Sequence, residues 1–278
     1  MTLSSIPSLV RQLSESEEPR LIWTNERGGS TFQTGSRYVK WNPHTTGLDL
    51  EAERLRLEWA IRYHAVPAVL EWGSNEEAQW LVTSALAGDG AVTESWLSRP
   101  LEAARAIGQG LRMLHDALPV ADCPFDWSVE ARVGRRVPIE QLGIPPIDRL
   151  VVCHGDACSP NTIIARDGSP AGRVDLGSLG VADRWADLAV ASMNLDYNYG
   201  PGWEDEFSGH TVLSEMTNEF ITTVFYGRTK TRSASHRMQH VSYFCSVNVS
   251  NTRKPKCPTT CSTGPQPATR LAACERER

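Results

Sequence analysis

Three polar side chains, Asp156, Asn161 and Asp175, have the types and the spacing needed to hold a divalent cation and to handle a proton. Asp156 ends the run His-Gly-Asp, Asn161 follows five residues later, and Asp175 opens the run Asp-Leu-Gly nineteen residues after Asp156. A carboxylate and an amide supply the hard oxygen ligands that Mg²⁺ prefers. A second carboxylate can accept or orient the proton of a hydroxyl group. The pattern predicts phosphoryl transfer from a nucleotide to a hydroxyl.

The residues around this loop predict the elements that bring the three side chains together. Apolar and β-branched runs predict three short strands, at Val151–Cys153, Thr162–Ala165 and Arg173–Val174. A turn at Asp167-Gly168 joins the last two into a hairpin, which folds Asp175 back beside Asn161. Both would then face one Mg²⁺, and Asp156 would point at the acceptor hydroxyl. The alternative interpretation is a hairpin with polar turn residues, in which Asp156 caps a turn or a helix.

A lysine and a glutamate upstream predict a clamp for the nucleotide. The alternating run Arg37–Trp41 predicts a strand that carries Lys40, and Leu50–Ile61 predicts a helix that carries Glu53, thirteen residues after the lysine. In protein kinases a lysine so placed binds the α- and β-phosphates of ATP, and a glutamate on the following helix holds its ammonium in place. Taken alone, Lys40 is an ordinary edge-strand lysine, and the downstream motif favours the phosphate-binding role.

Two later strand-like runs, Ala68–Gly73 and Gln79–Ala85, complete a small antiparallel sheet, and helical patterns follow them. We expect Ser84 and Leu86 to lie in the hinge between two lobes, where backbone groups meet adenine. The pair Gly28-Gly29 is a weaker candidate for a phosphate-covering turn, because it lacks the G-x-G-x-x-G pattern and an ordinary hairpin turn explains it equally well.

The chain resembles the aminoglycoside O-phosphotransferases, and in particular the aminoglycoside 3'-phosphotransferases (kanamycin and neomycin kinases). The stretches that carry this resemblance are Arg37–Trp41, Leu50–Trp59, Ala103–His115, Val151–Asn161 and Gly172–Ala189. The resemblance implies an α+β, protein-kinase-like fold with two lobes, a small antiparallel sheet lobe and a mainly helical lobe. The expected domains are a nucleotide-clamping lobe at residues 1–83 and a catalytic and substrate lobe at residues 84–227.

The resemblance also implies roles for individual residues. Asp156 is the expected catalytic base, and Asn161 and Asp175 are the expected Mg²⁺ ligands. The expected structural braces of the loop are His154, Asp183 and Asp187. The implied activity is transfer of the γ-phosphate of ATP to a hydroxyl of an aminoglycoside antibiotic, which gives antibiotic resistance. Ser178 stands where the family often has arginine, and this departure leaves the drug and the hydroxyl open.

Charge is unevenly distributed along the chain, whose net charge is −5. Residues 208–278 hold ten basic and four acidic side chains, a net +6, so residues 1–207 carry −11. An acidic surface attracts a polycationic substrate by electrostatic steering. The acidic residues expected near the acceptor site are Asp196, Glu204, Asp205 and Glu206. A solvated acidic surface explains these four residues equally well.

The N-terminus does not resemble a signal peptide, and no apolar run approaches membrane-spanning length. We therefore expect a cytoplasmic protein, where ATP is available. Its expected partner is a small polycationic molecule, without nucleic acid or membrane, and its expected state is a monomer or a weak dimer.

Residues 228–278 differ in character from the rest of the chain. They are rich in Ser, Thr, Pro and basic residues and include four of the seven cysteines. A zinc site at Cys257 and Cys261 is not favoured, since a second pair at matching spacing is missing. GC-rich codons assumed for residues 228–235, read in another frame, encode an acidic helix start of the kind that the resembling family has here. Our hypothesis is that this tail is translated out of frame and disordered, and the DNA sequence of the gene tests it.

Three alternative functions stay open at this point. The first is a kinase of another small alcohol, of the choline, homoserine or sugar kinase type. The second is a nucleotide-binding protein that is inactive because its C-terminal substrate segment is lost. The third is a nucleic-acid binder that uses the basic tail, although that tail lacks interleaved aromatic residues and a known binding module.

Overall fold

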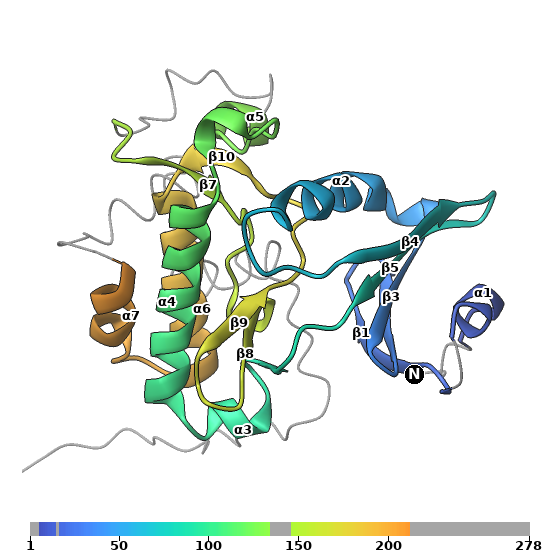
Figure 1. Cartoon of the computed structure of the whole chain (residues 1–278), viewed down its shortest axis with the longest axis horizontal. Coiled ribbons are helices and arrows are strands. Elements are labelled where there is room, and N and C mark those ends of the chain that lie inside the picture. The colour runs from blue at the N-terminus through green and yellow to red at the C-terminus, as the bar shows by residue number, and fades with distance from the viewer. Residues whose placement is uncertain (1–5, 15–16, 134–145, 212–278) are drawn as a thin grey trace, which may run out of the picture. The chain divides into compact units, whose positions relative to one another are not determined.

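The computed structural model describes residues 6–14, 17–133 and 146–211 (Figure 1). The contacts within the chain group residues 1–248 and residues 249–278 as two units, and every described residue belongs to the first. The tail predicted at residues 228–278 lies outside the described residues.

An antiparallel sheet of five strands forms the first part of the described chain. Its order is β1-β2-β3-β5-β4. The strands are β1 (Arg20–Thr24), β2 (Ser30–Thr34), β3 (Arg37–Pro43), β4 (Val69–Ser74) and β5 (Ala78–Ser84). Val39 of β3 lies opposite Phe32 and Val82, and the three form a buried cluster with Val10 of the short helix α1 (Ser8–Gln12). Because side chains alternate along a strand, Lys40 projects to the other face of the sheet.

Helix α2 (Leu50–Ala60) packs against β4 and β5. Asp49 caps it, since its carboxylate accepts hydrogen bonds from the backbone N–H groups of Glu51 and Ala52. The buried positions Leu50, Glu53, Leu57 and Ala60 recur every three or four residues. Glu53 therefore lies on the apolar, inward face of the helix.

The second part of the described chain combines helices with two small sheets. The helices are α3 (Glu94–Leu97), α4 (Pro100–Ala117), α5 (Val129–Val133), α6 (Trp185–Tyr199) and α7 (Glu204–Thr211). The strands are β6 (Asp89–Gly90), β7 (Leu150–Cys153), β8 (Thr162–Ile164), β9 (Pro170–Arg173) and β10 (Gly180–Asp183). β7 pairs with β10, and β6, β8 and β9 form the other sheet. The sequence predicted the hairpin of β8 and β9, while the pairing of β7 with β10 was not predicted. An antiparallel sheet followed by helices is the α+β arrangement that the sequence predicted.

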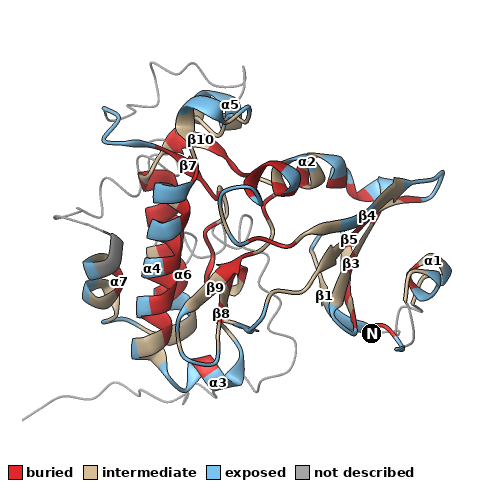
Figure 2. Cartoon of the chain, in the orientation of Figure 1, coloured by how far each residue is buried: buried red, intermediate tan, exposed pale blue. Residues whose placement is uncertain are grey.

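Buried residues occur on β3 and β5 and gather along α4 and α6 (Figure 2). The largest cluster joins α2, α4 and α6, and it includes Leu176 and Leu179, both 0% exposed. Burying a leucine side chain stabilises a fold by roughly 1.5–3 kcal/mol. The loop that follows Asp175 is therefore anchored in the core. Within the described ranges, every helix is too short or too polar to cross a lipid bilayer.

Candidate active site

The loop from His154 to Asn161 is held by Asp187, on the first turn of α6. The Asp187 carboxylate accepts hydrogen bonds from the backbone N–H groups of His154 at 2.6 Å and Gly155 at 2.9 Å. Inside the loop, the His154 ring donates from Nε2 to the Val174 carbonyl at 2.9 Å and accepts at Nδ1 from the backbone N–H of Asp156 at 3.3 Å. Burial lowers the pKa of His154 to about 4, so the ring is neutral at pH 7 and its two nitrogens have opposite roles.

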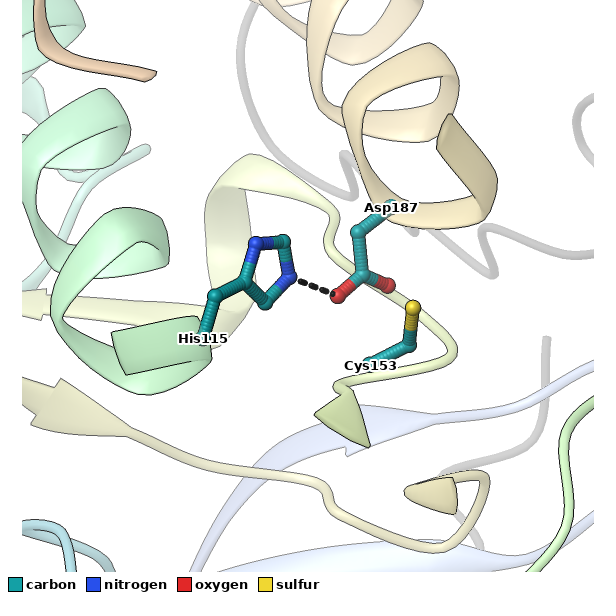
Figure 3. A group of neighbouring side chains, drawn as sticks. All are labelled: His115, Cys153 and Asp187. Carbon is teal, nitrogen blue, oxygen red and sulfur yellow. Dashed lines mark hydrogen bonds and ion pairs between the residues drawn. The ribbon is translucent and has the colours of Figure 1, made fainter. Parts of the chain in front are cut away.

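Asp187 has a third partner, His115 at the end of α4 (Figure 3). The His115 Nε2 lies 2.8 Å from Asp187 Oδ2. Burial tends to raise the pKa of Asp187. The hydrogen bond and the charge of His115, together with His154 and the Gly155 backbone N–H, bring that pKa below its ordinary value. Cys153 lies beside this pair, and the three could by type hold a metal ion. Since both Asp187 oxygens already accept hydrogen bonds, the group is a hydrogen-bonded brace rather than an open set of ligands.

Asp183, the other aspartate expected to brace the loop, is the last residue of β10 and lies two residues before α6. One of its carboxylate oxygens accepts from the backbone N–H of Trp185 at 3.1 Å, and the other accepts from the backbone N–H of Asp148 at 2.7 Å. Asp183 thus ends β10 and ties the backbone at Asp148 to the first residue of α6, the helix that carries Asp187.

Asp156 and Asn161 lie together at the far end of the loop. The Asn161 side-chain amide donates from Nδ2 to the Asp156 carbonyl at 3.0 Å, which leaves Oδ1 as the atom able to bind a cation. Burial, and then the nearby carboxylates of Asp175 and Asp187, raise the pKa of Asp156 to about 8. Once ionised, a carboxylate with a raised pKa is a stronger base than an ordinary aspartate, and without metal and nucleotide most of this group holds its proton at pH 7.

Asp175 returns to Asn161 through the hairpin, as the sequence predicted. The backbone N–H of Val174 donates to the Asn161 carbonyl at 3.1 Å. Asp175 has a positive φ of 65°, a conformation uncommon for residues other than glycine and found in excess at functional sites. The Asp175 carboxylate and the Asn161 amide oxygen are hard donors of the kind that suits Mg²⁺.

Lys40 connects the sheet to both acidic partners. Its Nζ lies 2.7 Å from Glu53 Oε1 and 2.7 Å from Asp175 Oδ1. Burial tends to lower the pKa of Lys40, but the two carboxylates outweigh burial and raise it above its ordinary value. The ammonium of Lys40 lowers the pKa of Asp175, so both groups are charged at pH 7. The structure thus brings Lys40, Glu53 and Asp175 together from the sheet, from α2 and from the β9 loop.

Ser84 is the last residue of β5, and Leu86 lies two residues after it. The backbone N–H of Ser84 donates to the Ala68 carbonyl at 2.9 Å, and the Ser84 hydroxyl accepts from the backbone N–H of Ala68 at 2.9 Å. Both groups are thus used within the sheet. Leu86 is half-buried beside Gly172 of the hairpin. Contact of this segment with adenine stays a prediction.

The four acidic residues predicted near the acceptor site lie on α6 and α7. Asp196 and Glu204 share a hydrogen bond, and burial together with Glu204 raises the pKa of Asp196 to about 6. Glu206 forms an ion pair with Arg105 of α4 at 2.8 Å, and Asp205 is exposed. Two of the four are therefore a carboxyl pair, and a third is already neutralised by an arginine.

A five-stranded sheet with a lysine–glutamate pair and a loop with Asp156 and Asn161 define a phosphotransferase of the protein-kinase-like fold. Residues 139–211 match the model of the phosphotransferase enzyme family. The chain is 35% identical to an aminoglycoside 3'-phosphotransferase of Streptomyces fradiae, over 59% of this chain and 73% of the relative. It is 32% identical to the streptomycin 3''-kinase of Streptomyces griseus, over 66% of this chain and 79% of the relative. The chain belongs to the aminoglycoside phosphotransferase family.

Solved structures of the family share the fold. The aminoglycoside phosphotransferase APH(3'')-Id of Streptomyces rimosus, in complex with ADP and streptomycin, superposes with a TM-score of 0.60 at 28% identity, over 78% of this chain and 94% of that chain. An aminoglycoside-3'-phosphotransferase of type VIII gives a TM-score of 0.62 at 26% identity, over the same shares of both chains. The predicted two-lobe kinase-like fold is confirmed.

Proposed function

We propose that the protein transfers the γ-phosphate of ATP to a hydroxyl of an aminoglycoside antibiotic and so gives antibiotic resistance. The observation that carries this proposal is Lys40, whose ammonium meets both Glu53 and Asp175. An ammonium held between two carboxylates is oriented and charged, as binding to the α- and β-phosphates requires. Kinship with the aminoglycoside 3'-phosphotransferase and the streptomycin 3''-kinase supports an aminoglycoside as the acceptor.

Each side chain of the loop has a task in this reaction. In its ionised form Asp156 accepts a hydrogen bond from the acceptor hydroxyl and takes its proton, while the new O–P bond forms and the bond between the γ-phosphorus and ADP breaks. Asn161 Oδ1 and the Asp175 carboxylate would hold Mg²⁺, which neutralises phosphate charge when bound. Because the transition state is loose, positioning and charge neutralisation contribute more than proton abstraction.

The carboxyl pair of Asp196 and Glu204 supports a cationic acceptor. Below about pH 6 the two groups share a proton, because burial and then Glu204 raise the pKa of Asp196. An ammonium of the drug can replace that proton and pair with both carboxylates. Asp205 is a further candidate contact, whereas Glu206 contributes least because Arg105 already neutralises it.

Product analysis tests the proposal. Purified protein is incubated with Mg²⁺, ATP and kanamycin, neomycin or streptomycin, beside an Asp156→Asn variant of nearly equal shape. We expect mass spectrometry to show one added phosphate on at least one drug, and a loss of rate of about 100-fold or more in the variant. Absence of product from every drug, with ATP binding intact, would contradict the proposal and favour a nucleotide-binding protein without turnover. Phosphorylation of choline, homoserine or a sugar in its place would favour the kinase of another small alcohol.

A further inference from the structure

Arg56 of α2 joins this helix to the loop Asp175–Leu179, called here the Asp175 loop. Arg56 lies three residues after Glu53, so the two side chains project from one side of the helix. Its Nε donates to the Leu179 carbonyl at 2.8 Å, and its Nη1 donates to the Ala52 carbonyl of its own helix at 2.9 Å. One guanidinium therefore connects the helix that carries Glu53 to the backbone of the loop that carries Asp175.

Phe125 gives the guanidinium a second support. The Arg56 guanidinium carbon lies 4.7 Å from the centre of the Phe125 ring, a cation–π distance. The same ring meets Trp59 of α2 edge-on, at 6.1 Å and 90°. The Phe125 carbonyl accepts from the backbone N–H of Val181 in β10 at 2.8 Å. Phe125 thus contacts α2 by its ring and β10 by its backbone.

Two glycines lie where these segments touch, and one of them is at close backbone range. A Cβ on Gly180 of β10 would lie 2.8 Å from the backbone of Asp126, so the segment after Phe125 lies directly on the strand. A Cβ on Gly177 would lie 3.8 Å from the Glu53 Cβ. The Asp175 loop therefore touches α2 at the residue that orients Lys40.

We propose that Arg56 is a positioning residue for phosphoryl transfer, which acts through Glu53. It fixes α2 against the Asp175 loop, so that Glu53 and Asp175 both keep their contacts with the Lys40 ammonium when a nucleotide binds. The inference rests on the nucleotide-binding role proposed for Lys40. In protein kinases phosphorylation of an activation loop controls the position of the corresponding helix. In this chain the hydrogen bond from the Arg56 guanidinium to the Leu179 carbonyl holds α2 in position.

A double-mutant cycle tests the inference without an acceptor. Calorimetry measures the dissociation constant of Mg·ATP for the wild type, Arg56→Met, Glu53→Gln and the double variant. We expect Arg56→Met to weaken binding about tenfold (about 1.4 kcal/mol) in the wild-type background. In the Glu53→Gln background we expect a further loss of less than about twofold, because residues that act through one another are not additive. An equal loss in both backgrounds, or no loss in either, would overturn the inference.

Arg54 supplies the matched control on the same helix. Arg54 forms an ion pair with Glu58 at 2.8 Å and lies over Trp72, so Arg54→Met removes a guanidinium of α2 that has its own partners away from the Asp175 loop. We expect this variant to bind Mg·ATP within about twofold of the wild type, and a tenfold loss would overturn the inference. Arg56→Lys keeps the charge but loses the planar fork, and we expect an intermediate loss.

The remaining outcomes separate this inference from the proposed function. If circular dichroism shows that Arg56→Met does not fold, the cycle is measured with Arg56→Lys and the same criterion of non-additivity decides. A wild type that binds Mg·ATP but phosphorylates no aminoglycoside would refute the proposed function. The double-mutant cycle would then still decide whether Arg56 acts through Glu53. A wild type that binds no Mg·ATP would overturn both.

Discussion

Gly155 lets the loop His154–Asn161 approach the Asp175 loop more closely than any residue with a side chain would. Its φ is +82°, and an added Cβ would lie 2.2 Å from the Ser178 carbonyl oxygen. The first value disfavours an L side chain, and the second excludes one unless the backbone moves. The middle residue of His-Gly-Asp therefore sets the spacing between Asp156 and the loop of Asp175.

The variant Gly155→Ala should lose both stability and activity. Gly168→Ala is the matched control, since Gly168 has a similar φ of +87° but its Cβ would meet its nearest neighbour, Glu102, at an ordinary 3.6 Å. The left-handed conformation costs about 1–2 kcal/mol in either variant. We expect roughly 3 kcal/mol or more for Gly155→Ala and a fall in phosphoryl transfer of about 100-fold. Thermal melts and rates measure these losses, and equal effects of the two substitutions would contradict the close approach.

At the scale of the elements, helices α4 and α6 meet the loop at one buried carboxylate. His115 comes from α4, Asp187 from α6 and two N–H donors from the loop, so Asp187 fixes three parts of the chain to one another. A buried carboxylate that loses a donor leaves part of its charge uncompensated. The position of the loop therefore depends on a carboxylate that binds its backbone.

Replacement of His115 distinguishes its hydrogen bond from its volume. We expect His115→Leu to lower the free energy of unfolding by about 1.5–3 kcal/mol, because a hydrogen bond to a charged group is lost. His115→Gln keeps an amide donor and should lose about half as much. Denaturant titration gives both values, and the rate of phosphoryl transfer should follow the same order. Equal destabilisation by Leu and Gln would show that His115 acts through packing.

Local patterns predicted several elements of the fold closely. The helix expected at Leu50–Ile61 is α2 (Leu50–Ala60), because capping and apolar spacing are local properties. The strand expected at Gln79–Ala85 is β5 (Ala78–Ser84), one residue displaced. In the site, two β-branched runs and the turn pair Asp167-Gly168 predicted the hairpin that joins Asn161 to Asp175, since both runs flank one short turn.

Long-range contacts were outside the reach of such patterns. His115 meets Asp187 across 72 residues, and Arg56 meets Leu179 across 123. Neither separation follows a helix or strand period. The sequence therefore placed His115 only within a stretch that carries the family resemblance, and it predicted no role for Arg56. A histidine at the end of an amphipathic helix was the available signal, and it is also typical of a favourable interaction with the helix dipole.

For the molecule as a whole, a change of pH alters the free energy of unfolding in opposite directions through different buried titratable groups. Burial, and also the guanidinium of Arg173, lower the pKa of His64 and His154 to about 4. The unfolded chain binds those protons near pH 6.5, so these groups contribute stability that is lost as pH falls from about 6.5 to 4. Asp156 has the opposite sign, because its pKa rises to about 8 on folding and the folded state holds the additional proton.

Removal of the Asp156 charge should therefore stabilise the protein free of metal and nucleotide, and increasingly so with rising pH. The unfolded carboxyl loses its proton near pH 3.8 and the folded one near pH 8, so the wild type loses up to about 1.4 kcal/mol per pH unit between these values. Asp156→Asn escapes that loss, while the histidine contributions are common to both proteins and cancel in the difference. We expect the difference in melting temperature between variant and wild type to grow from pH 4.5 to pH 8 and then to level off. Asp122→Asn, at an exposed aspartate, is the control for the removal of one carboxylate. A difference in melting temperature between Asp156→Asn and wild type that does not change with pH would contradict this prediction. It would show that the Asp156 carboxylate is as well solvated in the fold as in the unfolded chain. The site would then lack the strong base that the proposed reaction uses.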